Sequence, residues 1–385
     1  MISISLPVLP KEERGFGGGP TPLGQNMEEL LGVPSRVPPI RQSTIKDTFC
    51  LRYYALRHRF GLVRPGYRPA RENGSLFHAI VAPLYAGKSF EEAIEEGRKL
   101  KDKLLKELLS LDENLLEQTA ASVTKGLEQD LAKAAAMVRC YWQRYGIEPG
   151  RFQVIAVELP LRLGLTSIGI TTPAEMTVDL VIYDTVKHEV WIIDHKTVGG
   201  DPRHYQQTAT YDPQTRMYRL GVTAWIRGGH SPIPLETNDV TGIMFNAIRR
   251  PTIVQKKKQT FEEYVSEIED WYTATGIHEE TTTGGANAMP EPYPHRFSEP
   301  LLPMEFHRLL QQMTLMSEAD PMLGSFPRTP CIGNCTNRYG SPCTYREICA
   351  SHPATWGTLV NRMFQVEPAK EPIDVGLPHE TIRAA

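Results

Sequence analysis

The sequence predicts an α/β protein, because a long helical region is followed by β-branched segments that alternate with further helices. The helical region runs from residue 89 to about 145 and is rich in Glu, Lys, Leu and Ala, with few helix breakers. Strand-length runs of β-branched residues follow at 152–163, 176–184 and 189–197. With 41% hydrophobic residues in 385, the chain has enough apolar side chains for a core.

The segments before the helical region are an arm and a first helix. Residues 1–40 are rich in Gly and Pro and lack hydrophobic periodicity, which indicates a flexible arm. A helix is expected to begin at Ser43 or Thr44 and to contain Cys50.

The segments after the third strand alternate in type. Their patterns predict a helix, a strand, a second helix, a polar loop and a third helix, at 210–229, 240–250, 261–274, 276–297 and 301–319.

Charge and cysteine content limit the class of protein. A net charge of −3 argues against a uniformly basic nucleic-acid binder. No window offers the roughly 18 apolar residues of a membrane span, and the N-terminus lacks a signal-peptide pattern. Four of the six cysteines crowd between Cys331 and Cys349, which in a reducing compartment favours metal binding over disulfides. We therefore expect a soluble intracellular protein.

The stretch "WIIDHKT" ends a strand with three polar residues. Side chains alternate along a strand, so Asp194 and Lys196 share one side and His195 points to the other. If 184–189 closes a hairpin, Asp179 lies within one register step of Asp194. The pattern thus predicts two carboxylates beside one ammonium.

Glu158 is a third acid, in a strand that otherwise reads as core. An unpaired buried charge is costly, and like charges held together repel unless a cation neutralises them. Oxygen ligands suit Mg²⁺ or Mn²⁺, and a nearby lysine can orient water and offset charge on a phosphate. The alternative is that Asp194 to Lys196 merely end a strand at the surface and that Asp179 is a charge on an edge strand.

These residues resemble the core motif of the PD-(D/E)XK nuclease superfamily, an acid on one strand and acid-x-Lys on the next. The chain is most similar to the RecB-like branch, which includes nuclease domains of recombination helicase–nucleases, CRISPR-associated adaptation nucleases and phage exonucleases. The resemblance covers about Thr44 to Ala350. It implies a central mixed β-sheet flanked by helices and a metal-dependent DNA exonuclease in recombination, repair or end processing.

The resemblance also implies a domain arrangement. Residues 41–350 would form the nuclease domain, followed by a C-terminal tail at 351–385. The domain would contain an inserted helical block at about 77–148, a catalytic core at about 150–275 and a cysteine cluster at 331–349.

Metal ligands implied by the resemblance are His78, Asp179, Asp194 and the backbone carbonyl of His195. Lys196 would orient the attacking water. A lone histidine such as His78 on an apolar helix face is more often a core residue. The presence of the nuclease motif nevertheless favours His78 as a metal ligand.

Three further residues match the branch less specifically. Gln214 and Tyr218 match its Gln-x-x-x-Tyr motif, and positions i and i+4 share a helix face, although this spacing also arises by chance. Glu158 matches an acid often found one strand before the motif aspartate, which would hold a second metal or its water shell.

Iron–sulphur members of the branch place one cysteine before the nuclease core and three after it. Cys50, Cys335, Cys343 and Cys349 fit that arrangement, with Cys331 as an alternative ligand. Four thiolates hold either a 4Fe-4S cluster or a structural Zn²⁺, and spacing alone does not separate them. Cys140, beside Tyr141 and Trp142, reads instead as a core residue.

Two basic segments are candidates for contact with DNA, although charge clusters are more commonly solvated faces. The second is Arg249–Lys258, and the first has eight basic residues: Arg41, Lys46, Arg52, Arg57, Arg59, Arg64, Arg68 and Arg71.

Two other classes of function compete with an exonuclease. One is a DNA-binding scaffold of the same fold that no longer cuts, and the other is a site-specific restriction-type endonuclease. The resemblance implies DNA ends or single strands as the substrate and a single-strand annealing protein or helicase as the partner. It places the protein in the cytoplasm of a bacterium or phage-infected host, without membrane contact.

Overall fold

The structure is a computed structural model of the 385-residue chain. It describes residues 25–110, 117–148, 150–202, 205, 212–273, 291–326 and 343–368. The chain divides into two compact units, each discontinuous in sequence. The smaller unit comprises Met1–Val37, Asp47–Arg64 and Ala319–Ala369, and the unit that we call the sheet unit comprises Pro38–Lys46, Pro65–Glu318 and Lys370–Ala385.

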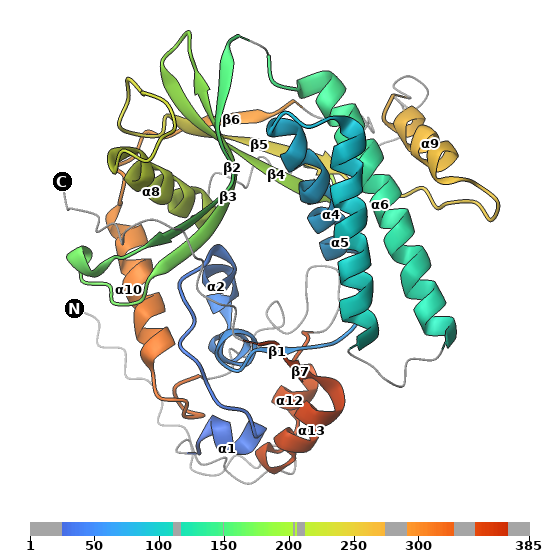
Figure 1. The fold of residues 1–385 in the computed structure, drawn as a ribbon. Helices are drawn as coiled ribbons and strands as arrows, with labels where there is room; N and C mark the ends of the chain where they lie inside the picture. Colours follow the sequence, from blue (N-terminus) through green and yellow to red (C-terminus); the bar gives the residue numbers. More distant parts are fainter. Residues whose placement is uncertain are drawn as a thin grey trace, which may run out of the picture. The chain divides into compact units, whose positions relative to one another are not determined.

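The sheet unit is built on a five-stranded sheet in the order β2-β3-β4-β5-β6 (Figure 1). Its strands are β2 Phe152–Leu163, β3 Ala174–Asp184, β4 Glu189–Val198, β5 Gly242–Arg249 and β6 Tyr293–Arg296. β4 and β5 run parallel, whereas the other neighbouring pairs run antiparallel. The sheet is therefore mixed, and the predicted strands that become β2 to β5 are confirmed, as is the hairpin between β3 and β4.

Helices lie on both sides of this sheet, with α4 and α6 on one side and α8 on the other (Figure 1). The helices of the sheet unit are α2 Gln42–Lys46, α4 Pro69–Tyr85, α5 Phe90–Ser110, α6 Glu117–Tyr145, α8 Pro213–Arg227, α9 Phe261–Thr273 and α10 Met304–Glu318. The predicted α/β fold with a central mixed sheet flanked by helices is confirmed.

One hydrophobic core fills the space between the sheet and helices α4, α6 and α9. Leu180 and Ile182 of β3 and Trp191 and Ile193 of β4 are buried in it. Each fully buried side chain of this size stabilises the fold by about 1.5–3 kcal/mol. This core fixes α4 against β4, so a side chain on α4 has a defined position relative to the sheet.

The edge strand β6 falls inside the segment predicted as a polar loop. Its four residues include Pro294 and are mostly exposed, so they show neither apolar alternation nor strand propensity. The strand forms because β5 offers a free edge and pairs Gly242 with Arg296. A Cβ atom at Gly242 would lie 2.4 Å from the carbonyl oxygen of His295, so the glycine permits this approach.

Residues 25–37 and 351–368, predicted as parts of a flexible arm and a C-terminal tail, belong to the smaller unit. Its elements include α1 Met27–Leu31, α12 Arg346–Ala350, α13 Trp356–Met363 and the pair β1 Leu62–Val63 with β7 Gln365–Val366. Met27 and Leu31 of the arm and Trp356 and Val360 of the tail are buried. These short apolar stretches have too few residues to show periodicity, yet they pack together. Residues 1–24 and 369–385 lie outside the described residues.

The helix predicted around Cys50 is interrupted. It consists of α2, a 3₁₀ turn at Asp47–Phe49, α3 Leu51–Tyr54 and a π-helical turn at Ala55–Arg59. Cys50 itself is extended, with φ −136° and ψ 109°. In this segment, residues up to Lys46 belong to the sheet unit and those from Asp47 on belong to the smaller unit. The chain therefore passes from one unit to the other where the helix is interrupted.

No helix within the described part of the chain is long and apolar enough to cross a membrane.

Candidate active site

Three acids lie in one row across three neighbouring strands. Val157 of β2 pairs with Leu180 of β3, which places Glu158 opposite Asp179. Leu180 also pairs with the residue before Asp194, which places Asp179 opposite Asp194. The prediction that Asp179 lies within one register step of Asp194 is confirmed.

Glu158 has an unusual backbone conformation for a strand residue. Its φ of +46° lies in the left-handed region, which costs a residue with a Cβ roughly 1–2 kcal/mol. On one side of it, Val157 packs with the core under α4 and α6. On the other side, Leu161 would contact a Cβ added at Gly221 of α8. Val157 and Leu161 would share a face in a regular strand, so the alternation of side chains along β2 is interrupted between these two residues.

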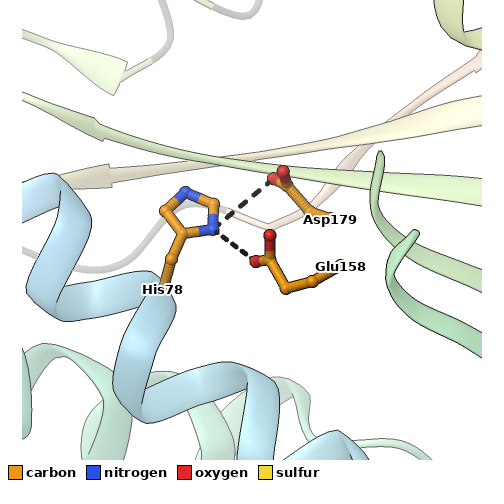
Figure 2. A group of neighbouring side chains, drawn as sticks. All are labelled: His78, Glu158 and Asp179. Carbon is orange, nitrogen blue, oxygen red and sulfur yellow. Dashed lines mark hydrogen bonds and ion pairs between the residues drawn. The ribbon is translucent and has the colours of Figure 1, made fainter. Parts of the chain in front are cut away.

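The Glu158 carboxylate lies beside His78 on α4. Figure 2 shows the imidazole of His78 directed toward both carboxylates, with Nδ1 3.2 Å from Oε1 of Glu158 and 3.9 Å from Oδ2 of Asp179. One ligand atom from each residue lies within 4.8 Å of the other two. One imidazole nitrogen and two carboxylates are a ligand set that suits a divalent cation such as Mn²⁺ or Mg²⁺.

The electrostatics of His78 fit a site that attracts positive charge. Burial disfavours the imidazolium, but the negative charges of Asp179 and Glu158 outweigh that effect and raise the pKa of His78. A proton on His78 and a cation between the three side chains would neutralise the same carboxylates.

Asp194 lies beside this group and is 1% exposed. Its Oδ1 accepts hydrogen bonds from Nζ of Lys196 at 2.6 Å and Nε2 of Gln214 at 2.9 Å. Burial raises the pKa of Asp194 to about 6, the charge of Asp179 adds to this, and Lys196 opposes it. Burial also acts against the ammonium of Lys196, but Asp194 and Asp179 raise its pKa well above the ordinary value. The lysine is therefore charged at neutral pH.

Helix α8 brings the glutamine and tyrosine to the same acid. Asp212 caps the helix by accepting a 3.0 Å hydrogen bond from the backbone N–H of Gln214. Nε2 of Gln214 also donates to the hydroxyl of Tyr218 at 2.7 Å. Burial, reinforced by Asp179 and Asp194, raises the pKa of Tyr218. Gln214 and Tyr218 therefore share one helix face and reach the predicted site.

The imidazole of His195 lies on the opposite side of β4 from Asp194, in a buried aromatic cage. It stacks on Tyr85 at 5.7 Å between ring centroids and also contacts Phe77 and Tyr141. Nδ1 lies 3.3 Å from Nδ2 of Asn246. Burial, with a smaller effect of neighbouring cations, lowers the pKa of His195, so the ring is neutral.

Several residues around the site carry no motif signal. Asn246 pairs in register with His195 and donates to Tyr141, whose hydroxyl lies 2.7 Å from that of Tyr85. A lone polar residue in the apolar strand "IMFNAI" is the one sign of it in the sequence. Burial and the charge of Asp194 raise the pKa of Tyr205, which the sequence did not single out.

Much of the first basic segment serves internal contacts. Arg52 and Arg59 are buried in the smaller unit, so the interpretation of these two as DNA-facing is wrong. Ion pairs join Arg41 to Glu175, Lys46 to Asp212, Arg57 to Glu367 and Arg64 to Glu347. Arg68 and Arg71 are exposed, as are Lys256, Lys257 and Lys258 of the second segment. Most of the arginines between residues 41 and 64 therefore stabilise the fold.

Three of the cysteines predicted to bind a metal or cluster lie within the described residues. Cys50 is buried and Cys343 and Cys349 are partly buried, all in the smaller unit, whereas Cys331 and Cys335 lie outside the described residues. Cys140 packs against the core under α6. Burial, with the charge of Glu269, raises its pKa to about 11.

Comparisons with known proteins identify the family. A search of curated proteins finds no match. The sequence profile described as PD-(D/E)XK nuclease superfamily matches residues 48–350, a span that includes all three acids of the row together with His78 and Lys196. Because this match covers more than half of the 385 residues, the chain belongs to the PD-(D/E)XK nuclease superfamily.

Proposed function

We propose that the protein is a DNA exonuclease that hydrolyses phosphodiester bonds with the help of Mg²⁺ or Mn²⁺. Members of the superfamily are nucleases that typically use these ions. The observation that carries the proposal is the convergence of His78, Glu158 and Asp179 next to the ion pair of Asp194 with Lys196. Carboxylates held this close repel one another unless a cation binds between them.

Each residue has a defined part in the proposed reaction. His78, Asp179, Asp194 and the backbone carbonyl of His195 hold the cation, and Glu158 holds it or a second one. When bound, the cation acts as a Lewis acid on the phosphate and lowers the pKa of water. Lys196, charged at neutral pH, orients the attacking water and offsets negative charge that develops on the phosphate. Gln214 and Tyr218 hold Asp194 and position the strand.

A scaffold that binds DNA without cutting and a restriction-type endonuclease are the competing functions. The buried Asp194, paired with the partly buried Lys196, argues against the scaffold, because a buried charge is costly to keep without use. The resemblance of the chain to the RecB-like branch favours an exonuclease over an endonuclease. The same resemblance supports a role in recombination, repair or end processing. It also supports an annealing protein or helicase as the partner and the cytoplasm of a bacterial or phage-infected cell as the location.

The proposal is tested with end-labelled linear DNA and covalently closed circular DNA, each with EDTA, Mg²⁺ or Mn²⁺. An exonuclease degrades the linear DNA in the presence of metal and leaves the circle intact. Asp194→Ala should abolish this activity, whereas Glu267→Ala, which removes a surface ion pair on α9, should not. Intact linear DNA with both metals would reject the nuclease, and equal cutting of the circle would favour the endonuclease.

We also propose that Cys50, Cys335, Cys343 and Cys349 hold a 4Fe-4S cluster in the smaller unit, with Cys331 as the alternative ligand and a structural Zn²⁺ as the alternative metal. The support is the split cysteine arrangement of iron–sulphur relatives. Brown protein that contains iron and loses its colour in Cys343→Ser would support the cluster. Colourless protein that contains zinc would reject it.

A further inference from the structure

We propose that Lys46 is a positioning residue for the active site and acts on Asp194 through Gln214. The inference rests on the proposed nuclease function and adds a residue that lies outside the catalytic motif. Lys46 is the last residue of α2, and its Nζ lies 2.6 Å from Oδ2 of Asp212 and 3.4 Å from Oε1 of Gln214. All of these residues belong to the sheet unit.

The Gln214 amide has a different partner at each end. Its Nε2 donates to Asp194 at 2.9 Å and to Tyr218 at 2.7 Å, while its Oε1 accepts from Lys46. If the amide turned over, its oxygen would face the Asp194 carboxylate and its NH₂ group would face the ammonium of Lys46. Both contacts are repulsive. Lys46 therefore favours the one orientation in which Gln214 donates to Asp194.

Asp212 joins Lys46 to the first turn of α8. One carboxylate oxygen of Asp212 accepts the backbone N–H of Gln214 at 3.0 Å, and the other pairs with Lys46. The N-cap thus fixes the backbone of Gln214 while the lysine fixes its side chain. Asp194 consequently receives two fixed donors, one from Lys196 directly and one from Gln214 under the control of Lys46.

The segment that carries Lys46 is itself anchored to β3. Ile40 donates its N–H to the carbonyl of Pro173 and accepts the N–H of Glu175, both at 2.9 Å. Arg41 forms an ion pair with the buried Glu175. Lys46 is therefore presented from a fixed base, which a residue that positions others requires.

Contact with a DNA phosphate is the competing role for a lysine whose side chain is 43% exposed. The two roles differ in kinetics. A phosphate contact that binds substrate and transition state alike changes KM and its salt dependence. A residue that orients a metal ligand changes kcat and metal affinity, and typically costs about 10–100-fold when removed.

The experiment compares Lys46→Met, Lys46→Arg and wild type by kcat and KM on linear DNA, and by Mn²⁺ affinity without DNA from calorimetry. Lys99→Met is the matched control, because Lys99 also pairs with an acid, Glu96 at 3.2 Å, on α5 and lies outside both basic segments. We expect Lys46→Met to lower kcat and Mn²⁺ affinity by about 10-fold or more with KM unchanged. Lys46→Arg should recover most of the loss, and Lys99→Met should match wild type.

A double variant tests the route through Gln214. If Lys46 acts through this amide, Lys46→Met should cause no further loss in a Gln214→Ala background. Independent losses that multiply would overturn the proposal, as would a raised KM with unchanged kcat. Thermal unfolding verifies that each variant is folded at the assay temperature, and Lys46→Gln replaces Lys46→Met if the latter is not.

Failure of the proposed function can be recognised separately. A wild-type protein that binds Mn²⁺ but cuts no DNA would reject the nuclease, while Mn²⁺ affinity would still report on Lys46. Unchanged Mn²⁺ affinity in Lys46→Met, together with unchanged kcat where there is activity, would reject the role of Lys46 alone.

Discussion

The backbone N–H of His195 donates a 2.8 Å hydrogen bond to Oδ2 of Asp179. This bond forms where the regular pairing of β3 with β4 ends, at Leu180 and Ile193. The Asp179 carboxylate thus replaces a backbone acceptor and is held in place by β4. His195 therefore contributes to the site through its main chain, while its ring packs among aromatic side chains.

His78→Ala and His195→Ala should differ in kind. His78→Ala removes a proposed metal ligand on a partly exposed helix face, so kcat should fall by about 100-fold or more with little change in stability. His195→Ala empties a buried cage and should lower the free energy of unfolding by about 2–3 kcal/mol, with a smaller loss of kcat. Steady-state kinetics and urea unfolding of both variants measure the difference. Equal or reversed losses of activity would show that this assignment is incorrect.

Substitutions of Glu158 should separate stability from activity. Asn tolerates the left-handed conformation better than most residues, so Glu158→Asn should unfold at or above the wild-type temperature although its activity falls. Glu158→Val, a β-branched residue at φ +46°, should be less stable by roughly 1–2 kcal/mol. Thermal unfolding of the two variants provides the comparison. A Val variant more stable than wild type would contradict the left-handed conformation of this residue.

Gln214→Glu should damage activity more than Gln214→Ala. The alanine variant loses the hydrogen bonds to Asp194 and Tyr218, with an expected cost of about 10–100-fold in kcat. The glutamate variant adds a negative charge next to the buried Asp194 carboxylate, and like charges repel strongly there. Single-turnover rates on linear DNA measure both. Equal activity of the two would indicate that Gln214 does not contact Asp194 during the reaction.

Cys140 should react slowly with iodoacetamide in the folded protein. Its pKa of about 11 leaves about one thiolate in a thousand at pH 8. Labelling should accelerate as the pH approaches 11 and become fast in urea, where the pKa returns toward 9.0. Peptide mass spectrometry measures the labelled fraction against pH.

The same shift has a defined effect on stability. Because the folded protein holds the thiol proton more tightly, the stabilising contribution is complete below about pH 9 and is lost as the pH rises toward 11. Cys140→Ala should remove this part of the pH dependence, and an unchanged alkaline stability profile in the variant would contradict it.

Much of the fold was predictable from local pattern. The first predicted strand matches β2 in both bounds, and the breaker-poor region from residue 89 became α5 and α6. Edge strand β6 was not predictable, because its pairing depends on the free edge of β5 and not on its own residues. The same holds for α1 and α13, short elements that are stable only through contacts within the smaller unit.

The sequence by itself determined the acid-x-Lys spacing, the side of β4 on which Asp194 and Lys196 lie, and the candidate residues His78, Gln214 and Tyr218. The spacing and the side follow from strand periodicity, which is local, whereas the three candidate residues rest on the resemblance to known nucleases. Tertiary structure alone decided that Glu158 meets His78, 80 residues earlier, and that Lys46 reaches Gln214, 168 residues later. Such contacts depend on how strands and helices pack, and packing joins residues whose separation along the chain carries no periodic signal.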